Sequence, residues 1–369
     1  MNRKNTIILI VLFVTATFLS ACGPMEGMEG VAGLPTSTTE PVNAPSAEPL
    51  DSPAPTTTLI PPSAGRIIFV SDREGEWNLH TMDPLGGSLM RIVAMPVEDR
   101  PRPSPDGRRV AFVSTVNDNT DIYIVNVDGS GFFRVTDNPS KDSAPAWSPD
   151  GTRLVFESYR NGNFDIFVVH ADGSGLTPLT DDAAGDSNPQ WSPAGDRIAF
   201  VSTRGGNSDI FLIRPDGSGL TGLTNDPPPT SDPVWSPDGS RIAFRTSSNQ
   251  DSHQVCVMNA DGSSARCLTG FAKAGIPSWS PDGNSLAYLA AHDTGTGIDV
   301  LSVADGAVRS LRFNVEPRSD PLWSPDGARL VFQANAGGNM DVYVVTVATG
   351  KFVSLASFGG FDGFPIWVR

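Results

Sequence analysis

The stretch Pro145-Ala146-Trp147-Ser148-Pro149-Asp150-Gly151 organises this chain, and it opens a short apolar run that ends in Phe156. The same phrase, Pro-x-Trp-Ser-Pro-x-Gly, returns every 44 residues, and one copy carries Ala194 in place of the aspartate. An earlier copy at 101–107 has Pro103 in the tryptophan position. A repeat of this regularity indicates a fold built from equivalent units. The tryptophans of the period are Trp147, Trp191, Trp235, Trp279, Trp323 and Trp367.

Each period contains four short strand-like runs separated by turn residues. In one copy these runs cover 189–191, 197–201, 209–213 and 220–223. Ser-Pro-x-Gly joins the first two runs, and Asp-Gly-Ser-Gly joins the last two, where Asp-Gly favours a hairpin turn. Four-stranded units at a fixed period of this length are typical of the blades of a β-propeller. The aromatic residues expected to fill the wedges between blades are the repeated tryptophans and Phe112, Phe156, Phe200 and Phe244.

We therefore predict an all-β fold, a seven-bladed β-propeller of four-stranded antiparallel blades. The second runs can be counted directly, and there are seven, from 67–70 to 329–333. The first unit lacks its opening strand, whereas residues 364–369 supply an opening strand with nothing after it. The economical solution is a ring closed by the C-terminal strand in blade 1, because closure removes free sheet edges. Six or eight blades are the alternatives.

The first 22 residues have the order of an export signal. Arg3 and Lys4 precede an apolar run over 7–19, which is shorter than a membrane-spanning helix requires. The following Leu-Ser-Ala-Cys resembles the box of bacterial lipoproteins, so we expect a signal peptide over 1–21 and lipid attachment at Cys22. The alternative is an ordinary secretory signal with an unrelated cysteine.

Residues 22–64 differ in composition from the rest of the chain. They are rich in Pro, Thr and Ser with little apolar periodicity, so we predict a disordered tether before a propeller over 65–369. The net charge of −15 argues against nucleic acid as a partner, because phosphate binding needs clustered Lys and Arg. The expected location is extracytoplasmic, anchored by lipid to a bacterial membrane in the periplasm or at the cell surface.

Cys256 and Cys267 flank one of the turns between a third and a fourth strand. Other copies hold apolar pairs there, such as Val168 and Leu179, so the two side chains should lie opposite one another on adjacent strands. Because an exported protein meets an oxidising environment, we predict a disulfide. Two reduced cysteines packed as small apolar groups are the alternative.

The repeat resembles that of TolB-type, WD-like β-propellers over about 65–369, and 191–224 is a near-ideal copy. The resemblance implies the fold more firmly than a function. TolB itself is a periplasmic, partner-binding component of the Tol–Pal envelope system, and it has an N-terminal α/β domain where this sequence has the predicted tether. Other propellers with this repeat gate prolyl oligopeptidase-like and tricorn-type peptidases, or act as lyases on pectin fragments.

The sequence contains no recognisable catalytic motif. It has no Gly-x-Ser-x-Gly elbow, no His-Glu-x-x-His and no zinc-type spacing of Cys and His. The histidines occupy non-equivalent positions, and turn formation explains the repeated aspartates. We therefore expect no metal, no cofactor and no enzymatic activity. The alternative is a hydrolase or lyase with its site in the mouth of the central channel, which would require polar residues converging from several blades.

Partner binding is expected on one face of the ring. The Ser-Pro-Asp-Gly and Asp-Gly-Ser-Gly turns share a face and are nearly identical, whereas the connectors on the opposite face differ from blade to blade. Recognition usually lies in such loops. We expect a monomer that binds a protein or a cell-envelope polymer on this face. A special case of this hypothesis is that the protein is an accessory of an envelope complex. For each candidate, a solvated loop residue without a partner is the alternative. The candidate contacts are Arg73, Trp77, Arg160, Asp186, Arg204 and Phe361.

Overall fold

The computed structural model describes residues 65–225, 228–250, 252–293, 295–356 and 359–368. These residues form strands, turns and loops, and no helix among them is long and apolar enough to cross a membrane. The signal peptide, the lipidated Cys22 and the tether that the sequence predicts all lie outside the described residues.

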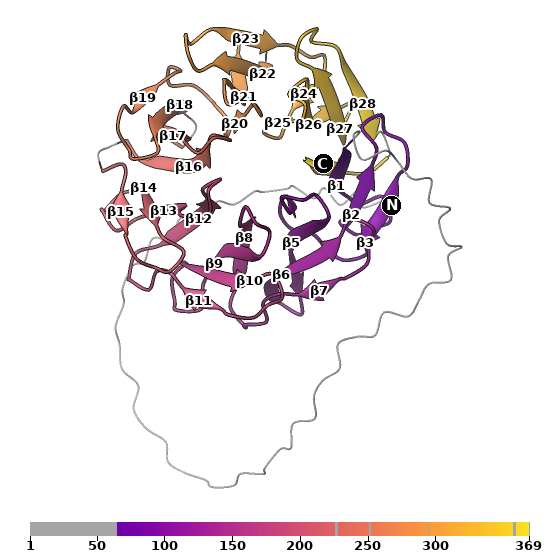
Figure 1. The fold of residues 1–369 in the computed structure, drawn as a ribbon. Helices are drawn as coiled ribbons and strands as arrows, with labels where there is room; N and C mark the ends of the chain where they lie inside the picture. Colours follow the sequence, from indigo (N-terminus) through magenta and orange to yellow (C-terminus); the bar gives the residue numbers. More distant parts are fainter. Residues whose placement is uncertain (1–64, 226–227, 251, 294, 357–358, 369) are drawn as a thin grey trace, which may run out of the picture. The chain divides into compact units, whose positions relative to one another are not determined.

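The strands form seven antiparallel sheets that follow one another around a ring (Figure 1). Six of the sheets have four strands, and the last has five because its inner strand is divided into two short pieces. The predicted seven-bladed, four-stranded propeller is therefore confirmed. Blades 1 and 2 consist of β29 (Asp362–Val368), β1 (Arg66–Ser71), β2 (Asn78–Met82) and β3 (Met90–Val93), and of β4 (Arg102–Pro103), β5 (Arg109–Val116), β6 (Asn119–Asn126) and β7 (Phe133–Arg134).

The other five blades follow in chain order. Blade 3 has β8 (Asp142–Trp147), β9 (Arg153–Ser158), β10 (Asp165–His170) and β11 (Thr177–Pro178). Blade 4 has β12 (Asp186–Trp191), β13 (Ile198–Ser202), β14 (Asp209–Ile213) and β15 (Thr221–Gly222). Blade 5 has β16 (Thr230–Trp235), β17 (Arg241–Asn249), β18 (Ser252–Asn259) and β19 (Arg266–Cys267). Blades 6 and 7 have β20 (Ser278–Trp279), β21 (Ser285–His292), β22 (Gly295–Ser302) and β23 (Val308–Leu311), then β24 (Glu316–Pro317), β25 (Leu322–Trp323), β26 (Arg329–Ala336), β27 (Asn339–Thr346) and β28 (Phe352–Ala356).

Blade 1 closes the ring by joining the two ends of the described chain. β29 pairs antiparallel with β1, so Arg66 lies opposite Val368 and Ile67 lies opposite Trp367. This pairing covers a strand edge that would otherwise be free. The predicted closure by the C-terminal strand is thus confirmed.

The turn after each inner strand explains the repeated Ser-Pro-Asp-Gly. In blade 3 the hydroxyl of Ser148 donates to Asp150 at 2.6 Å, and the N–H of Gly151 donates to the carbonyl of Ser148 at 2.8 Å. Gly151 has a φ of 67°, a left-handed conformation that glycine adopts without strain. These side-chain contacts give the aspartate a structural role in the turn.

A proline stands two residues before the tryptophan position in every blade. Proline cannot donate a ladder hydrogen bond, and the strand register shifts beside it in blades 3, 4 and 5. The residue just before the proline has a positive φ in four blades. These residues are Ala144 (51°), Asn188 (53°), Asp232 (54°) and Phe364 (50°).

Large apolar side chains fill the spaces between blades, but the tryptophans are not equivalent. Phe112, Phe156, Phe200 and Phe244 are buried, as predicted. Trp147, Trp191, Trp279 and Trp367 are also buried, with 7–8% of each side chain exposed. Trp235 and Trp323 also pack against the clusters between blades, as predicted, but both are only half-buried.

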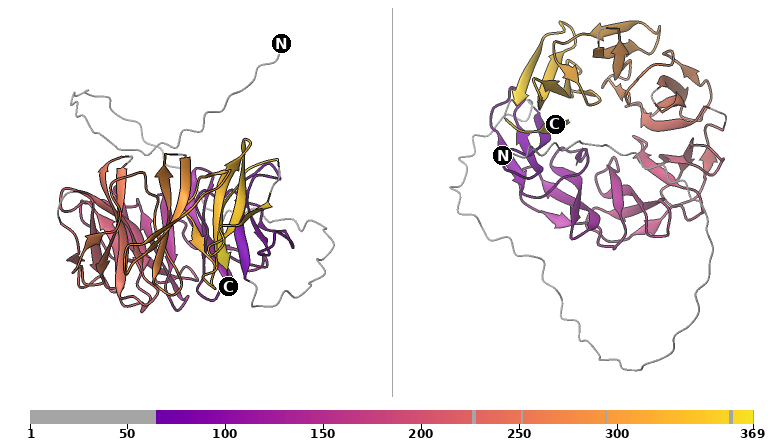
Figure 2. Two further views of the ribbon diagram at one scale, coloured as in Figure 1. Left: turned by 90° about the horizontal axis from the view of Figure 1, so that it is seen from above. Right: turned by 180° about the vertical axis from the view of Figure 1, so that it is seen from behind.

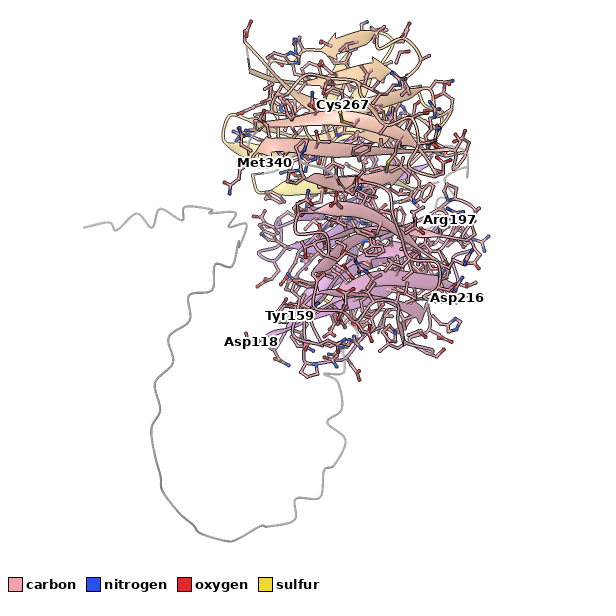
Figure 3. The ribbon with its side chains drawn as sticks, turned by 90° about the vertical axis from the view of Figure 1, so that its left-hand side faces the viewer. Asp118, Tyr159, Arg197, Asp216, Cys267 and Met340 are labelled. Atoms are coloured by element: carbon pink, nitrogen blue, oxygen red, sulfur yellow. A yellow bond between two sulfur atoms is a disulfide. The ribbon has the colours of Figure 1, made fainter. Side chains whose placement is uncertain are left out.

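The ring has two faces, because adjacent strands in each blade run in opposite directions (Figure 2). One face, here called the turn face, carries the turns between first and second strands and between third and fourth strands. The other, the loop face, carries the second-to-third loops and the connections between blades. Figure 3 shows Arg197 and Asp216 on the turn face, and Asp118, Tyr159 and Met340 on the loop face.

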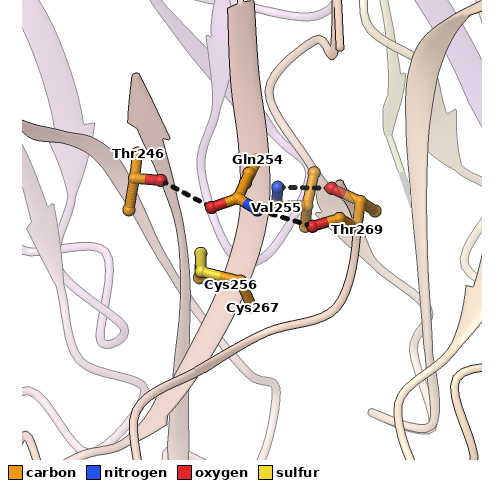
Figure 4. The surroundings of a disulfide bond; sticks show 6 residues. All are labelled: Thr246, Gln254, Val255, Cys256, Cys267 and Thr269. Atoms are coloured by element: carbon orange, nitrogen blue, oxygen red, sulfur yellow. Dashed lines mark hydrogen bonds between the residues drawn. A yellow bond between two sulfur atoms is a disulfide. The ribbon is translucent and has the colours of Figure 1, made fainter. Parts of the chain in front are cut away.

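The two cysteines of blade 5 form a disulfide (Figure 4). Cys256 on β18 pairs in register with Cys267 on β19; Cys256 is fully buried and Cys267 is exposed. Next to them the N–H of Val255 donates to the hydroxyl of Thr269 at 2.9 Å, and the amide of Gln254 donates to the Thr269 carbonyl at 3.0 Å. The disulfide therefore fastens a two-residue outer strand to its blade.

Candidate functional sites in the channel and on the loop face

Three of the candidate arginines occupy the same place in their blades. Each follows a second strand on the loop face and reaches an aspartate at the beginning of the inner strand of its own blade. The pairs and their nitrogen–oxygen distances are Arg73 with Asp362 (2.7 Å), Arg160 with Asp142 (3.1 Å) and Arg204 with Asp186 (2.8 Å). Each arginine Nε also donates to the serine that ends the second strand, at 2.8 Å in all three blades.

These arginine–aspartate clasps are largely withdrawn from solvent. The arginine side chains are 12–18% exposed and the aspartates at most 1%. Each guanidinium also lies over a phenylalanine ring, with 5.2 Å from Arg73 to Phe69 and 5.0 Å from Arg204 to Phe211. A buried charge of this kind needs its partner. Of the predicted contacts, Arg73, Arg160, Arg204 and Asp186 are therefore part of the internal architecture of their blades.

The other two predicted contacts, Trp77 and Phe361, meet where the ring closes. Their rings stack with centroids 4.7 Å apart and planes inclined by 7°. Both side chains are half-buried, and the N–H of Phe361 donates to a carboxylate oxygen of Asp72 at 2.6 Å. The pair presents part of its aromatic surface on the loop face beside β1 and β29.

A cavity of about 620 Å³ lies along the axis on the turn-face side. The inner strands ring this axis in Figure 1, and the cavity lining comes from the inner-strand ends of blades 1, 2, 5, 6 and 7. The residues that line it include Trp279, Trp323 and Trp367, several prolines, and two cationic residues, Arg100 and Arg102. An apolar wall with a few polar groups is typical of a ligand site.

Four charged residues connect the inner segments of blades 2, 5, 6 and 7. Arg245 donates to a carboxylate oxygen of Asp232 at 2.7 and 2.9 Å, and to the carbonyl of Ala274 at 3.1 Å. Asp320 accepts the N–H of Ile276 at 3.0 Å, and its own carbonyl lies 3.4 Å from a guanidinium nitrogen of Arg100. We call Arg100, Asp232, Arg245 and Asp320 the inner charge belt.

Burial governs the protonation of the inner carboxylates. Desolvation raises the pKa of Asp320, while the cations of Arg100 and Arg245 and the Ile276 N–H oppose that rise. Burial also raises the pKa of Glu157, against hydrogen bonds from the Asn188 N–H and the Ser143 hydroxyl. Within the belt two cations therefore face two carboxylates, and the charges largely neutralise one another.

Arg102 differs from the belt. In the described part of the chain its guanidinium takes part in no hydrogen bond or ion pair, although its carbonyl accepts from the indole of Trp147 at 2.9 Å. Its charge lies close enough to Arg100 to lower the pKa of that neighbour, after desolvation, which is the larger cause. The channel cavity thus contains one cation that no carboxylate of the described residues neutralises.

The sequence reasoning missed the channel residues. Arg102 lies one residue before the tryptophan position of its copy, whereas Arg100, Asp232 and Asp320 lie three residues before it. Comparing copies at that third position would have found them, because charged residues alternate there with Ala144 and other uncharged residues beside an unchanging proline. Among the described residues no group of three or more His, Cys, Asp or Glu side chains is placed to hold a metal ion.

A family model described as the TolB β-propeller domain matches residues 95–188 and, in a second copy, 182–274. The chain is a TolB-type propeller. The Tol-Pal system protein TolB of Anaeromyxobacter dehalogenans is 41% identical to this TolB-type chain over 44 residues, and the match covers 12% of this chain and only 10% of that relative.

Two solved structures share the fold of this TolB-type propeller at low sequence identity. TolB from Acinetobacter baumannii matches with a TM-score of 0.57 and 20% identity, over 84% of this chain and 68% of that one. An oligogalacturonate lyase in complex with manganese matches with a TM-score of 0.62 and 13% identity, over 80% of this chain and 86% of the other. At such identities both likenesses describe the fold alone.

Proposed function

We propose that this TolB-type propeller is a non-enzymatic binding module of the bacterial envelope that holds a segment of a partner protein in its axial channel. The observation that carries the proposal is the cavity of about 620 Å³, whose lining combines tryptophans and prolines with Arg102. Such a lining suits an extended peptide that brings apolar side chains and one carboxylate. The carboxylate would pair with the Arg102 guanidinium, which has no hydrogen-bond or ion-pair partner among the described residues.

The arrangement of charge favours the channel over the loop face as the main site. On the loop face, the candidate arginines are already paired with buried aspartates, so a partner would have to break these clasps to use them. Trp77 and Phe361 remain as a secondary contact there, because their stacked rings are only half-buried. A cell-envelope polymer in place of a protein is the variant of this proposal that such aromatic surfaces favour.

The location belongs to the same proposal. An apolar run followed by Leu-Ser-Ala-Cys supports export and lipid attachment at Cys22, and residues 22–64 have the composition of a tether. A monomeric propeller on such a tether would reach partners at some distance from the membrane, as an accessory of an envelope complex.

A capture experiment tests the proposal. The full chain, carrying a C-terminal tag, is the bait in detergent-solubilised membranes, beside two variants with the same change of charge in the same blade. Arg102→Glu alters the cavity, whereas Arg108→Glu alters an exposed turn residue outside its lining. We expect a protein retained by the wild type and by Arg108→Glu to be lost with Arg102→Glu. Equal retention by all three, with all three folded, would refute a channel site.

One observation favours a second candidate function, a hydrolase or lyase in the channel. Burial raises the pKa of Asp320, and the negative charge of Asp232 adds to the rise, as the acid of an acid–base pair requires. The test is turnover of oligogalacturonate and of peptide substrates by the wild type and by Asp320→Asn. Turnover by the wild type that disappears in Asp320→Asn would establish enzymatic activity. Absence of turnover by the wild type would refute this second function for these substrates.

A further inference from the structure

An arginine from one blade covers the repeated tryptophan of the next blade at four interfaces. The guanidinium lies over the indole in each case, and at two interfaces it also donates to the glycine carbonyl of the neighbouring turn, at 2.7 Å (Arg109 to Gly151) and 2.8 Å (Arg241 to Gly283). The pairs are Arg109 and Trp147 (4.7 Å), Arg153 and Trp191 (4.7 Å), Arg241 and Trp279 (5.0 Å), and Arg329 and Trp367 (5.0 Å).

The interface between blades 6 and 7 lacks this arginine. Ser285 stands in its position, six residues after Trp279, and the short serine side chain cannot reach the indole of Trp323. A groove of about 330 Å³ is present there, lined by Ser285, Trp323 and Gly327, with Asp282 and Asp326 at its edge. Trp323 is half-buried, whereas the four covered tryptophans are only 7–8% exposed.

Trp235 provides the comparison within the chain. In the described residues neither Trp235 nor Trp323 has a guanidinium over its ring, and both are half-buried. Blade 4 does carry its arginine, Arg197, whose side chain is 49% exposed beside Asp196. Arg197 is therefore available within the chain to cover the indole of Trp235. Trp323 has none, because Ser285 cannot supply one.

We propose that the groove between blades 6 and 7 binds the guanidinium of an arginine side chain from a partner polypeptide. The groove offers an open indole face and the Gly327 carbonyl, which are the groups that hold Arg109 and Arg241 at their interfaces. It adds two carboxylates that stay ionised at neutral pH, because serine hydroxyls lower the pKa of Asp282 and of Asp326. A planar cation between an aromatic face and anions is strongly favoured.

The site takes arginine rather than lysine because it matches a planar fork. A guanidinium can stack on Trp323 and still donate in its own plane to Gly327, whereas an ammonium is a compact, strongly hydrated charge that cannot do both. The groove adjoins the channel cavity, since Pro281 and Trp323 line both. The inference goes beyond the proposed function, because the groove and the Arg102 cavity can be tested separately.

Fluorine NMR of the full chain tests the site directly. The seven tryptophans are labelled as 5-fluorotryptophan, and Trp323→Phe identifies the resonance of Trp323. The probes are acetyl-Gly-Arg-Gly-amide, its lysine and citrulline counterparts, and free L-arginine. We expect the arginine peptide to shift the Trp323 resonance saturably, with the other two peptides at least about tenfold weaker. Equal binding of the lysine or citrulline peptide, or much tighter binding of free arginine, would overturn the proposal.

Two matched variants test the site: one should close the groove between blades 6 and 7, and the other should open an equivalent groove between blades 5 and 6. Ser285→Arg restores the residue present at the equivalent position of the other blades, so it should remain folded, shift the Trp323 resonance without ligand and abolish the response. Arg241→Ser should uncover Trp279 and create a second responding resonance. Arg108→Glu, an exposed turn residue outside the lining of both cavities, should leave the response unchanged. An unchanged response in Ser285→Arg, or no response in the wild type, would refute the groove as an arginine site.

Discussion

Arg204 joins two carboxylates of one connection in blade 4, with Asp186 at 2.8 Å and Asp182 at 3.0 Å. Asp186 begins the inner strand, and Arg204 follows the second strand, so the pair fixes the loop-face end of both strands to each other. Blades 1 and 3 repeat the relationship with Arg73 and Arg160. The clasp therefore belongs to the fold, although an arginine in a variable loop is also what a binding site would show.

Removal of the arginine should destabilise the propeller strongly. We expect Arg204→Ala to lower the free energy of unfolding by about 3–5 kcal/mol, because it leaves Asp186 buried without its cation. Urea denaturation followed by circular dichroism measures the change. Arg214→Ala, an exposed arginine on the turn face, should stay within about 0.5 kcal/mol of the wild type. A similar small effect for both variants would contradict the structural role of the clasp.

The buried carboxylate of Asp341 should make stability depend on pH. Burial, and then the charge of Asp362, raises its pKa, and one of its oxygens has no hydrogen-bond partner in the described residues. A raised pKa means that the folded state holds the proton more tightly than the unfolded state does. The ionised group therefore costs stability at pH 7, and the cost fades as the pH falls towards the unfolded value of about 3.9.

Asp341→Asn should accordingly stabilise the protein at pH 7 and have a shrinking effect between pH 5 and 4, which urea titrations at each pH would show. The matched control variant, Asp216→Asn, should change the stability at pH 7 in the opposite direction. Hydrogen bonds from Ser218 lower the pKa of Asp216, so Asp216→Asn should destabilise at pH 7 and approach the wild type in acid. A gain from Asp341→Asn that is independent of pH would rule out ionisation as its cause.

Reduction of the Cys256–Cys267 disulfide should cost about 2–3 kcal/mol, because the bond closes a short loop whose ends have a sequence separation of 11. The exposure of Cys267 allows dithiothreitol to reach the bond. Unfolding curves with and without reductant give the difference. The double variant Cys256→Val/Cys267→Leu, which copies the apolar pairs of other blades, should be more stable than Cys256→Ser/Cys267→Ser and insensitive to reductant. Identical curves for oxidised and reduced protein would contradict the prediction.

Trp367 should be worth more to stability than its repeat partner Trp323. Its indole is 8% exposed under Arg329 and lies in the strand that closes the ring, whereas Trp323 is half-buried. We expect Trp367→Ala to cost about 3–5 kcal/mol and Trp323→Ala clearly less. Thermal and urea unfolding of the two variants compare them. The reverse order would show that closure contributes less than the packing suggests.

The fold could be predicted from the sequence because each repeat contains the turn and core residues that form its own blade. The proline before Trp191 and the Ser-Pro-x-Gly turn after it recur at one spacing, so counting the copies counts the blades. The site could not be predicted in the same way, because its contacts cross repeats. Arg73 finds Asp362 at a separation of 289 residues, and Arg100 meets the carbonyl of Asp320 at 220. No local pattern links such residues; only the closed ring brings them together.

The missing arginine of blade 6 could have been noticed. Ser285 is the one exception in a column of arginines, but the column has meaning only once the guanidinium is seen on the next tryptophan. All six repeated tryptophans pack between blades, but the repeat could not predict how fully each one is buried, for the same reason. A repeat predicts what its members share, whereas Trp235 and Trp323 differ through their neighbours.

The closure of the ring by β29 also determines when the molecule can finish folding. A chain made from its N-terminus produces β1 well before β29, so Arg66 can pair with Val368 only after β29 has been made. Until then β1 presents an open edge, and such an edge invites pairing with other chains. We therefore expect the slowest step of folding to follow the synthesis of β29. A chaperone that covers the unpaired edge of β1 during this interval would protect the unfinished ring from pairing with other chains.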